Sequence, residues 1–254
     1  MDFWAASCVR SWASDRWPQP DRWPRRLERW PAHERVSFAG RSTERDRQDR
    51  CTSPPTCYPL RLRPRHVLDI YPAATDGPSP VIVFFYGGGW EEGERGDYFF
   101  VGSALAARGF TAVIPDYRVF PEVRFPAFIE DVAEALRWTV DHIAEFGGDP
   151  RRVIVMGHSA GAHIAAMLAF DRKWLARVNL DASRDLNAMI GLAGPYDFLP
   201  LHSQTLKEIF GPEKYLAATQ PINFVGLDAP PSFLATGRND RSVDPAIRLG
   251  SPNA

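Results

Sequence analysis

The chain has 254 residues, a formal net charge of −1 and a hydrophobic content of 44%. This length and apolar content suit one α/β domain with a sizeable core. A net charge near zero gives no global field that would attract nucleic acid or an anionic membrane surface. The three cysteines (Cys8, Cys51 and Cys57) lie outside the expected core, so neither a disulfide framework nor a zinc site is predicted.

The sequence gives no sign of a membrane segment. No apolar stretch reaches the length of a membrane span, and the N-terminus lacks the apolar core of a signal peptide. We therefore expect no membrane association, no nucleic-acid partner and a cytoplasmic location.

Residues 1–59 differ in composition from the rest of the chain. They are rich in Arg, Trp and Pro, and a Trp-Pro pair begins at Trp17, Trp23 and Trp30. No helix or strand periodicity persists there, and the prolines would interrupt either element. Three interpretations stay open: a disordered extension, a basic aromatic arm that binds a partner, or the product of a start codon assigned too early. The predicted organisation is this extension followed by one domain at 60–254.

From residue 60 onward, predicted strands and helices alternate. Strands are predicted at 67–71, 81–85, 110–114, 153–156, 189–192 and 232–236, and helices at 97–108, 126–146 and 162–168. The uninterrupted apolar run at 81–85 is typical of a strand buried on both faces of a parallel sheet. Residues 195–230 are rich in proline and partly helical, which suits a cap insertion over a pocket. The alternation predicts an α/β fold with a doubly wound, mostly parallel sheet and helices on both faces.

The most informative motif is Gly157-His158-Ser159-Ala160-Gly161, between a predicted strand and a predicted helix. In this context G-x-S-x-G forms a nucleophile elbow, a tight turn that exposes the serine hydroxyl. The two glycines leave room for the turn, and Ser159 is the candidate nucleophile. The amide of Ala160 would lie at the start of the helix, where it can face a developing oxyanion.

A second motif, Tyr86-Gly87-Gly88-Gly89-Trp90, directly follows the buried strand. Glycines at this point let backbone N–H groups approach a ligand closely. Lipases and esterases carry a His-Gly-Gly-Gly loop here that supplies the rest of the oxyanion hole, and Tyr86 replaces that His. The alternative is a flexible glycine loop. Dinucleotide binding is poorly supported because the glycines lack the G-x-G-x-x-G spacing.

With these motifs, about residues 60–245 resemble the α/β-hydrolase superfamily. The chain is most similar to a small bacterial esterase/lipase branch with feruloyl-esterase-like, isoprenylcysteine-methylesterase-like and kynurenine-formamidase-like proteins. Further matching segments are Leu68-Asp69-Ile70-Tyr71, Pro115-Asp116-Tyr117-Arg118, Phe125-Pro126-Ala127 and Phe146-Gly147-Gly148-Asp149-Pro150. In that family, Asp-Tyr-Arg and Gly-Gly-Asp-Pro are scaffold signatures, to which we assign no chemistry.

The resemblance implies a serine hydrolase of carboxylesterase type that acts on small ester or related acyl substrates, without metal or cofactor. Ser159 would be the nucleophile, and the N–H groups of Gly88, Gly89 and Ala160 would form the oxyanion hole. The acid of the triad follows the serine in this fold, on the loop after a later strand. Asp240 matches that place. Asp197 and Asp244 are weaker candidates for the acid, and the expected role of Asp197 is to shape the cap.

The base is the difficulty. A serine nucleophile needs a His that takes its proton, and in this fold the His comes after one more helix and strand. These elements need roughly 25 residues, and no His follows Asp240. We expect the side chain of His158 to point away from the site and His163 to pack inside or line the first turn of its helix. His202, in the cap, is the histidine that could move into the site and serve as the base.

Two hypotheses follow for the domain, which is expected to lack its last strand and helix. The coding sequence is frameshifted or truncated around a hydrolase body, or the chain is a natural non-catalytic relative that binds acyl or ester ligands. In both cases we expect severely impaired activity. The strand at 232–236 would become a bare sheet edge beside uncovered apolar surface, which predicts low solubility or self-association through that edge.

Overall fold

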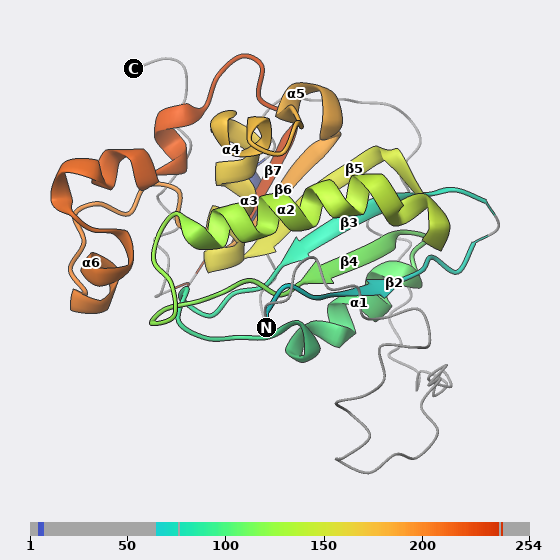
Figure 1. Ribbon diagram of the computed structural model, residues 1–254, viewed down its shortest axis with the longest axis horizontal. Coiled ribbons are helices and arrows are strands. Elements are labelled where there is room, and N and C mark those ends of the chain that lie inside the picture. Colours follow the sequence, from blue (N-terminus) through green and yellow to red (C-terminus); the bar gives the residue numbers. More distant parts are fainter. Residues whose placement is uncertain (1–4, 8–64, 76, 239, 241–254) are drawn as a thin grey trace, which may run out of the picture. The chain divides into compact units, whose positions relative to one another are not determined.

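The computed structural model describes residues 5–7, 65–75, 77–238 and 240 (Figure 1). Its strands are β1 (Ala5–Ser7), β2 (Leu68–Tyr71), β3 (Ser79–Phe85), β4 (Thr111–Pro115), β5 (Gly148–His158), β6 (Ala188–Leu192) and β7 (Ser232–Thr236). Its α-helices are α1 (Phe99–Ala106), α2 (Ala127–His142), α3 (Ala160–Phe170), α4 (Lys173–Ala176), α5 (Ala182–Asp185) and α6 (Gln204–Phe210). Short 3-10 helices are η3 (Arg95–Tyr98), η4 (Ile143–Phe146), η5 (Glu213–Thr219) and η6 (Pro221–Phe224). Every strand predicted between 67 and 236 is present.

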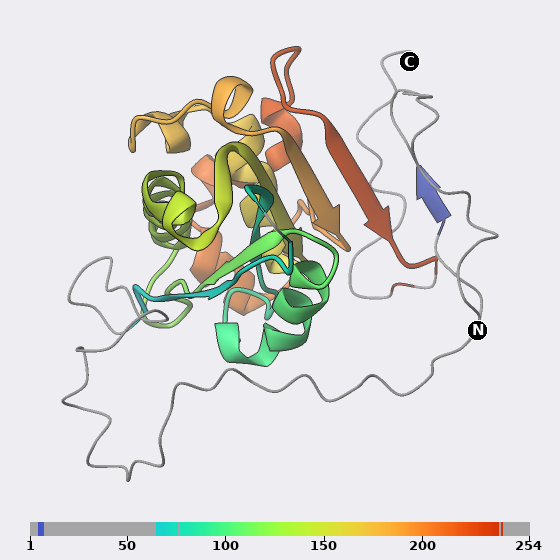
Figure 2. The ribbon, with the colours of Figure 1, turned by 90° about the vertical axis from the view of Figure 1, so that its right-hand side faces the viewer.

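The strands form one sheet in the order β1-β7-β6-β5-β3-β4-β2. The five strands from β7 to β4 run parallel, while β1 and β2 pair antiparallel at the two edges. Helices α2 and α3 cover one face of the sheet, and α1 lies on the other face (Figure 2). The predicted doubly wound, mostly parallel sheet is confirmed.

The strand order places a crevice between β3 and β5. From β3 the chain moves outward to β4, then crosses back over β3 to β5 and continues to β6 on the opposite side. Ligands of open α/β sheets bind at such a reversal, outside the carboxyl ends of the strands. In the register Phe85 pairs with Gly157, so β3 and β5 end level with each other. The glycine loop and the Ser159 turn therefore begin at neighbouring points of one sheet edge.

The two faces of the sheet differ in how completely they are covered. All residues of α3 are buried, as is typical of a helix that is apolar on every side. On β5, Val153 and Val155 are buried beneath α3, whereas Met156 on the opposite face is only partly covered. On that face, Phe100 of α1 and Phe233 of β7 are exposed. The expected uncovered apolar surface is therefore present on the α1 face.

The edge of the sheet at β7 corrects one expectation. Ala5, Ala6 and Ser7 pair with Thr236, Ala235 and Leu234, so the outer edge of β7 is not bare. Pairing with β1 gives partners to backbone groups that we expected to be free. The rest of the N-terminal extension, 1–4 and 8–59, lies outside the described residues.

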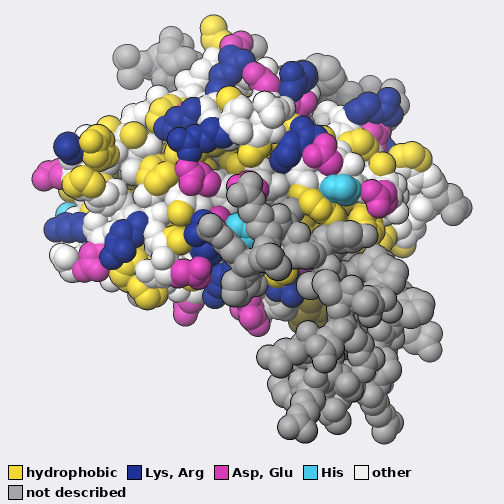
Figure 3. Space-filling view, viewed as in Figure 1, with side chains coloured by type: hydrophobic (Ala, Val, Ile, Leu, Met, Phe, Trp, Pro, Cys, Tyr) yellow, Lys and Arg dark blue, Asp and Glu magenta, His cyan; other side chains and the backbone are white. Residues whose placement is uncertain are grey.

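The predicted cap at 195–230 contains α6, η5 and η6, which lie to one side of the sheet in Figure 1. Figure 3 shows basic and acidic side chains intermingled across one face of the molecule, in keeping with the net charge near zero. Among the helices of the described residues, none combines the length and apolar character needed to cross a bilayer.

Candidate active site

Ser159 occupies the turn between β5 and α3 in a strained backbone conformation. Its φ of 53° and ψ of −120° lie outside the regions that a residue with a side chain ordinarily adopts. The Ser159 N–H donates to the carbonyl of Leu192 at 2.8 Å, and the Ser159 carbonyl accepts from the N–H of Ala162 at 2.9 Å. The strained turn is thus held from β6 on one side and from the first turn of α3 on the other.

The flanking glycines make this turn sterically feasible. A Cβ added to Gly157 would lie 2.1 Å from the carbonyl oxygen of Gly161. A Cβ added to Gly161 would lie 2.0 Å from the carbonyl oxygen of Phe85, on the neighbouring strand β3. Both obstacles are backbone atoms, which cannot rotate away. These contacts are the geometry expected of a nucleophile elbow.

The glycine loop after β3 is tightly turned and lies against the elbow. Gly88 and Gly89 have φ values of 126° and 62°, which favour glycine. The Gly88 carbonyl accepts from the N–H groups of Glu91 and Glu92, each at 3.0 Å. A Cβ added to Gly87 would lie 3.2 Å from Ser159 Cβ, so Gly87 borders the nucleophile. These hydrogen bonds close the loop into a turn beside Ser159.

Ala160, the third candidate oxyanion-hole residue, is buried as the first residue of α3. Its position at the helix N-terminus leaves its N–H without a partner inside the helix, so the amide is free to face a bound oxygen. The structure thus brings Ser159, Ala160 and the glycine loop together at the crevice between β3 and β5.

Asp240, the candidate acid, follows β7 and is half-buried. Its N–H donates to the carbonyl of Gly237 at 3.0 Å, which closes a turn after the strand. Burial lowers the pKa of the His158 ring, and the negative charge of Asp240 opposes this shift. Asp240 is therefore close enough to His158 to act on it electrostatically. Of the weaker acid candidates, Asp197 is exposed and Asp244 lies outside the described residues.

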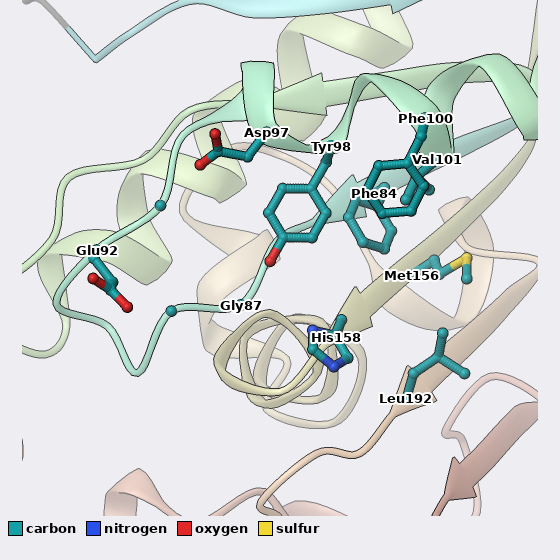
Figure 4. A pocket seen from close by; sticks show the side chains of 12 residues that line it. Phe84, Gly87, Glu92, Asp97, Tyr98, Phe100, Val101, Met156, His158 and Leu192 are labelled. Atoms are coloured by element: carbon teal, nitrogen blue, oxygen red, sulfur yellow. The ribbon is translucent and has the colours of Figure 1, made fainter.

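His158 lines a cavity of about 730 Å³ on the α1 face of the sheet. A Cβ added to Gly87 would lie 3.0 Å from His158 Nδ1, so the ring borders the glycine loop. Ser159 is not among the residues that line this cavity. Figure 4 shows the imidazole at the end of β5, with Gly87 beside it and Met156 and Leu192 further along the floor.

The other histidines of the described part of the chain are engaged elsewhere or exposed. His66 lies 3.3 Å from Asp131, and His142 lies 3.1 Å from Glu145. His202 is exposed in the cap. Among the described residues, no histidine ring is hydrogen-bonded to Ser159. The base that the elbow requires is therefore not assembled by the residues that the structure describes.

His163, four residues after Ser159 on α3, is fully buried, as one of our two expectations had it. Its Nε2 lies 2.8 Å from the carbonyl oxygen of Thr219 in the cap. The ring packs edge-on against Trp90 and contacts Phe198 and Phe210. Burial lowers the pKa of His163 to about 4, although the Thr219 carbonyl opposes this shift. His163 is thus a neutral link between α3, the glycine loop and the cap.

Sequence reasoning missed this link. Burial of His163 was one of the two expectations, but its contacts with the cap were not predicted. The aromatic partners come from distant parts of the chain and carried no local signal. Among the described residues, no group of three or more His, Cys, Asp or Glu side chains is arranged to hold a metal ion.

Comparisons with known proteins give consistent results. The sequence model of the BD-FAE family matches residues 68–247. Isoprenylcysteine alpha-carbonyl methylesterase ICME of Arabidopsis thaliana is 36% identical over 143 residues, which are 55% of this chain and 34% of that protein. Esterase LipC of Mycobacterium tuberculosis is 32% identical over 188 residues, which are 66% of this chain and 42% of that protein. The chain spans less than half the length of these two relatives.

A solved structure agrees with the sequence matches. The apo form of Thermogutta terrifontis esterase 2 superposes with a TM-score of 0.54 at 30% sequence identity. The superposition covers 65% of this chain and 64% of that chain.

Proposed function

Because the chain belongs to the BD-FAE family and has the α/β-hydrolase fold, we propose that it is a serine hydrolase of carboxylesterase type. Its substrates would be small esters or related acyl compounds. The observation that carries the proposal is the strained Ser159 between Gly157 and Gly161. Strain of this kind costs about 1–3 kcal/mol, persists only where the surrounding structure holds it in place, and is concentrated at active sites.

The proposed reaction begins with attack of Ser159 Oγ on the acyl carbonyl carbon. The carbonyl π electrons move to oxygen, and the oxyanion is stabilised by the N–H groups of Gly88, Gly89 and Ala160. The serine proton passes to a base and from there to the departing alkoxide. Water then attacks the acyl-enzyme, and the carboxylic acid and free Ser159 are released. The chain's own residues would supply the nucleophile and the oxyanion hole, and Asp240 would orient the base.

We expect this chain to be a slow catalyst. Among the described residues, no imidazole lies in hydrogen-bonding contact with Ser159, so the hydroxyl lacks the base that would raise its nucleophilicity. Enzymes that lose triad members retain rate accelerations of roughly 10³ to 10⁴ over water, from the oxyanion hole and substrate binding. The same observation favours a second candidate function, a non-catalytic member of the fold that binds ester or acyl ligands.

Hydrolysis of p-nitrophenyl acetate by the purified protein, beside a folded Ser159→Ala variant, tests the proposal. Turnover that disappears in the variant supports Ser159 as the nucleophile. Covalent labelling of Ser159 by a p-nitrophenyl phosphonate, measured by intact mass, is a second readout that needs a single turnover. Equal rates in both proteins together with no label on Ser159 would overturn the hydrolase proposal and favour the ligand-binding alternative.

A further inference from the structure

Tyr86, the residue that replaces the expected His before the three glycines, is completely buried. Its ring stacks on that of Tyr117, with centroids 4.5 Å apart and planes 18° apart. On its other side it stacks on Tyr98 at 5.6 Å. The first residue of the glycine loop is therefore fixed between two aromatic rings.

Polar contacts hold both the phenol and the backbone of Tyr86. The Tyr86 hydroxyl donates to Asp116 Oδ1 at 3.1 Å and accepts from the N–H of Tyr117 at 3.3 Å. The Tyr117 hydroxyl donates to the carbonyl of Tyr86 at 2.7 Å. Burial raises the pKa of Tyr86, so the phenol stays protonated and remains a donor to the carboxylate. The Tyr86 carbonyl, held by the Tyr117 hydroxyl, belongs to the peptide bond between Tyr86 and Gly87.

The far end of the loop meets the same carboxylate. Arg95 donates from its backbone N–H to Asp116 Oδ1 at 2.7 Å and from Nη1 to Asp116 Oδ2 at 2.5 Å. Its Nε also donates to Asp69 Oδ1 at 2.9 Å. Asp116 is buried although Arg95 is partly exposed, and charge-assisted hydrogen bonds to a buried carboxylate are strong. One carboxylate thus joins the two ends of the segment that contains Gly87–Gly89.

The loop has little freedom between these ends. A Cβ on Gly88 would lie 2.1 Å from the carbonyl oxygen of Glu92, and one on Gly93 would lie 2.8 Å from that of Gly87. The Gly93 carbonyl also accepts from Arg65 Nη1 at 3.1 Å. Because the loop is folded closely onto itself, a shift at either end would be transmitted to the glycine amides.

We propose that Tyr86 and Arg95, joined on Asp116, are positioning residues that aim the amides of Gly88 and Gly89 at the oxyanion. This inference rests on the proposed hydrolase function and deepens it. It gives the Asp116-Tyr117 segment, which the sequence suggested was only scaffold, a role in the site. The unit does not touch substrate; it acts through the direction of the loop amides.

Tyr86→Phe is the test variant because it keeps both ring stacks and removes the two hydroxyl hydrogen bonds. Tyr98→Phe is its matched control: it removes a hydroxyl from the neighbouring ring, which makes no hydrogen bond to the loop among the described residues. Small displacements of catalytic groups can cost a hundredfold in rate. We expect kcat for p-nitrophenyl acetate to fall about tenfold or more in Tyr86→Phe with KM within about twofold, and no such change in Tyr98→Phe.

A purely structural role predicts a different result. If Tyr86→Phe lowers the melting temperature but keeps the wild-type kcat, the positioning role is overturned. An equal fall in kcat for Tyr98→Phe would also overturn it, because loss of a hydroxyl that makes no hydrogen bond to the loop would then have the same effect.

Failure of the hydrolase proposal and failure of the positioning role give different results. If the wild-type chain neither hydrolyses the ester nor accepts the phosphonate, the hydrolase proposal fails. The positioning role of Tyr86 is then tested by hydrogen exchange of the peptide that spans Gly87–Gly89. Faster exchange in Tyr86→Phe than in Tyr98→Phe supports control of the loop by Tyr86. Equal exchange rates in the two variants overturn it.

Discussion

The two faces of the sheet are completed to different degrees, although they share the same strands. On the α3 face, Gly157, Ala160 and Gly161 of the elbow are buried, and so are all residues of α3. On the α1 face, Phe100 and Phe233 are 58% and 41% exposed, and a cavity of about 730 Å³ ends at His158. The α3 side of the elbow is therefore more completely packed than the side of His158, on which the charge of Asp240, the candidate acid, acts. Among the described residues, the elbow forms although no histidine ring is hydrogen-bonded to Ser159.

The largest loss of stability is expected from a side chain added inside the elbow. In Gly161→Ala the new Cβ would meet the carbonyl oxygens of Phe85 and Tyr86 at 2.0 and 2.4 Å, and neither can move without distorting β3. We expect the free energy of unfolding to fall by about 3 kcal/mol or more, in the range of severe overpacking. Urea denaturation followed by circular dichroism measures the change.

Gly226→Ala is the matched control, because a Cβ at Gly226 would have no atom within 4 Å. Its stability should stay within about 0.5 kcal/mol of the wild type. If Gly161→Ala were equally harmless, the elbow would not be the rigid element that we describe.

The sequence was sufficient to predict the elbow because every contact that forms it is either local or imposed by the ends of parallel strands. Gly157, Ser159 and Gly161 lie within one turn, and β3 ends beside β5 in any sheet of this topology. The uninterrupted apolar run of β3 and the helix periodicity of α2 likewise carried their own signals.

The sequence was not sufficient where partners are distant and their patterns are common. The pairing of Ala5–Ser7 with β7 joins residues more than 200 positions apart, and three small residues carry no strand signal. Tyr86 and Asp116 are 30 positions apart, so the Tyr-for-His replacement looked like a neutral departure. The assignment of Asp240 as the acid stays a prediction, because no histidine ring is hydrogen-bonded to Ser159 among the described residues.

The stability of the protein should depend on pH through the buried imidazole of His163 on the α3 face. His163 has a pKa of about 4 in the folded protein, while an unfolded histidine titrates near 6.5. Between these pH values the unfolded chain binds a proton that the folded chain does not. Stability should therefore fall as the pH drops from 6.5 to 4, by up to roughly 3 kcal/mol from this group.

His163→Gln removes this titration and should flatten the dependence of stability on pH between 6.5 and 4. The measurement is a series of urea denaturations across that window. His202→Gln, which removes an exposed imidazole from the cap, is the control and should keep the wild-type slope. A wild-type slope in His163→Gln would show that other groups govern acid sensitivity and that the link between α3 and the cap is not pH-dependent.

The smallest change in stability is expected from substitutions of the exposed apolar side chains on the α1 face. We expect self-association, but since β1 covers the β7 edge, it should involve the apolar α1 face. Phe233→Gln combined with Phe100→Gln should keep the free energy of unfolding within about 1 kcal/mol of the wild-type value, because both side chains are already exposed. The dissociation constant measured by sedimentation equilibrium should rise at least tenfold.

Leu227→Gln changes an exposed apolar residue in the cap region and should leave association as in the wild type. A monomeric wild type at high concentration would mean that the exposed apolar side chains of the α1 face do not drive association.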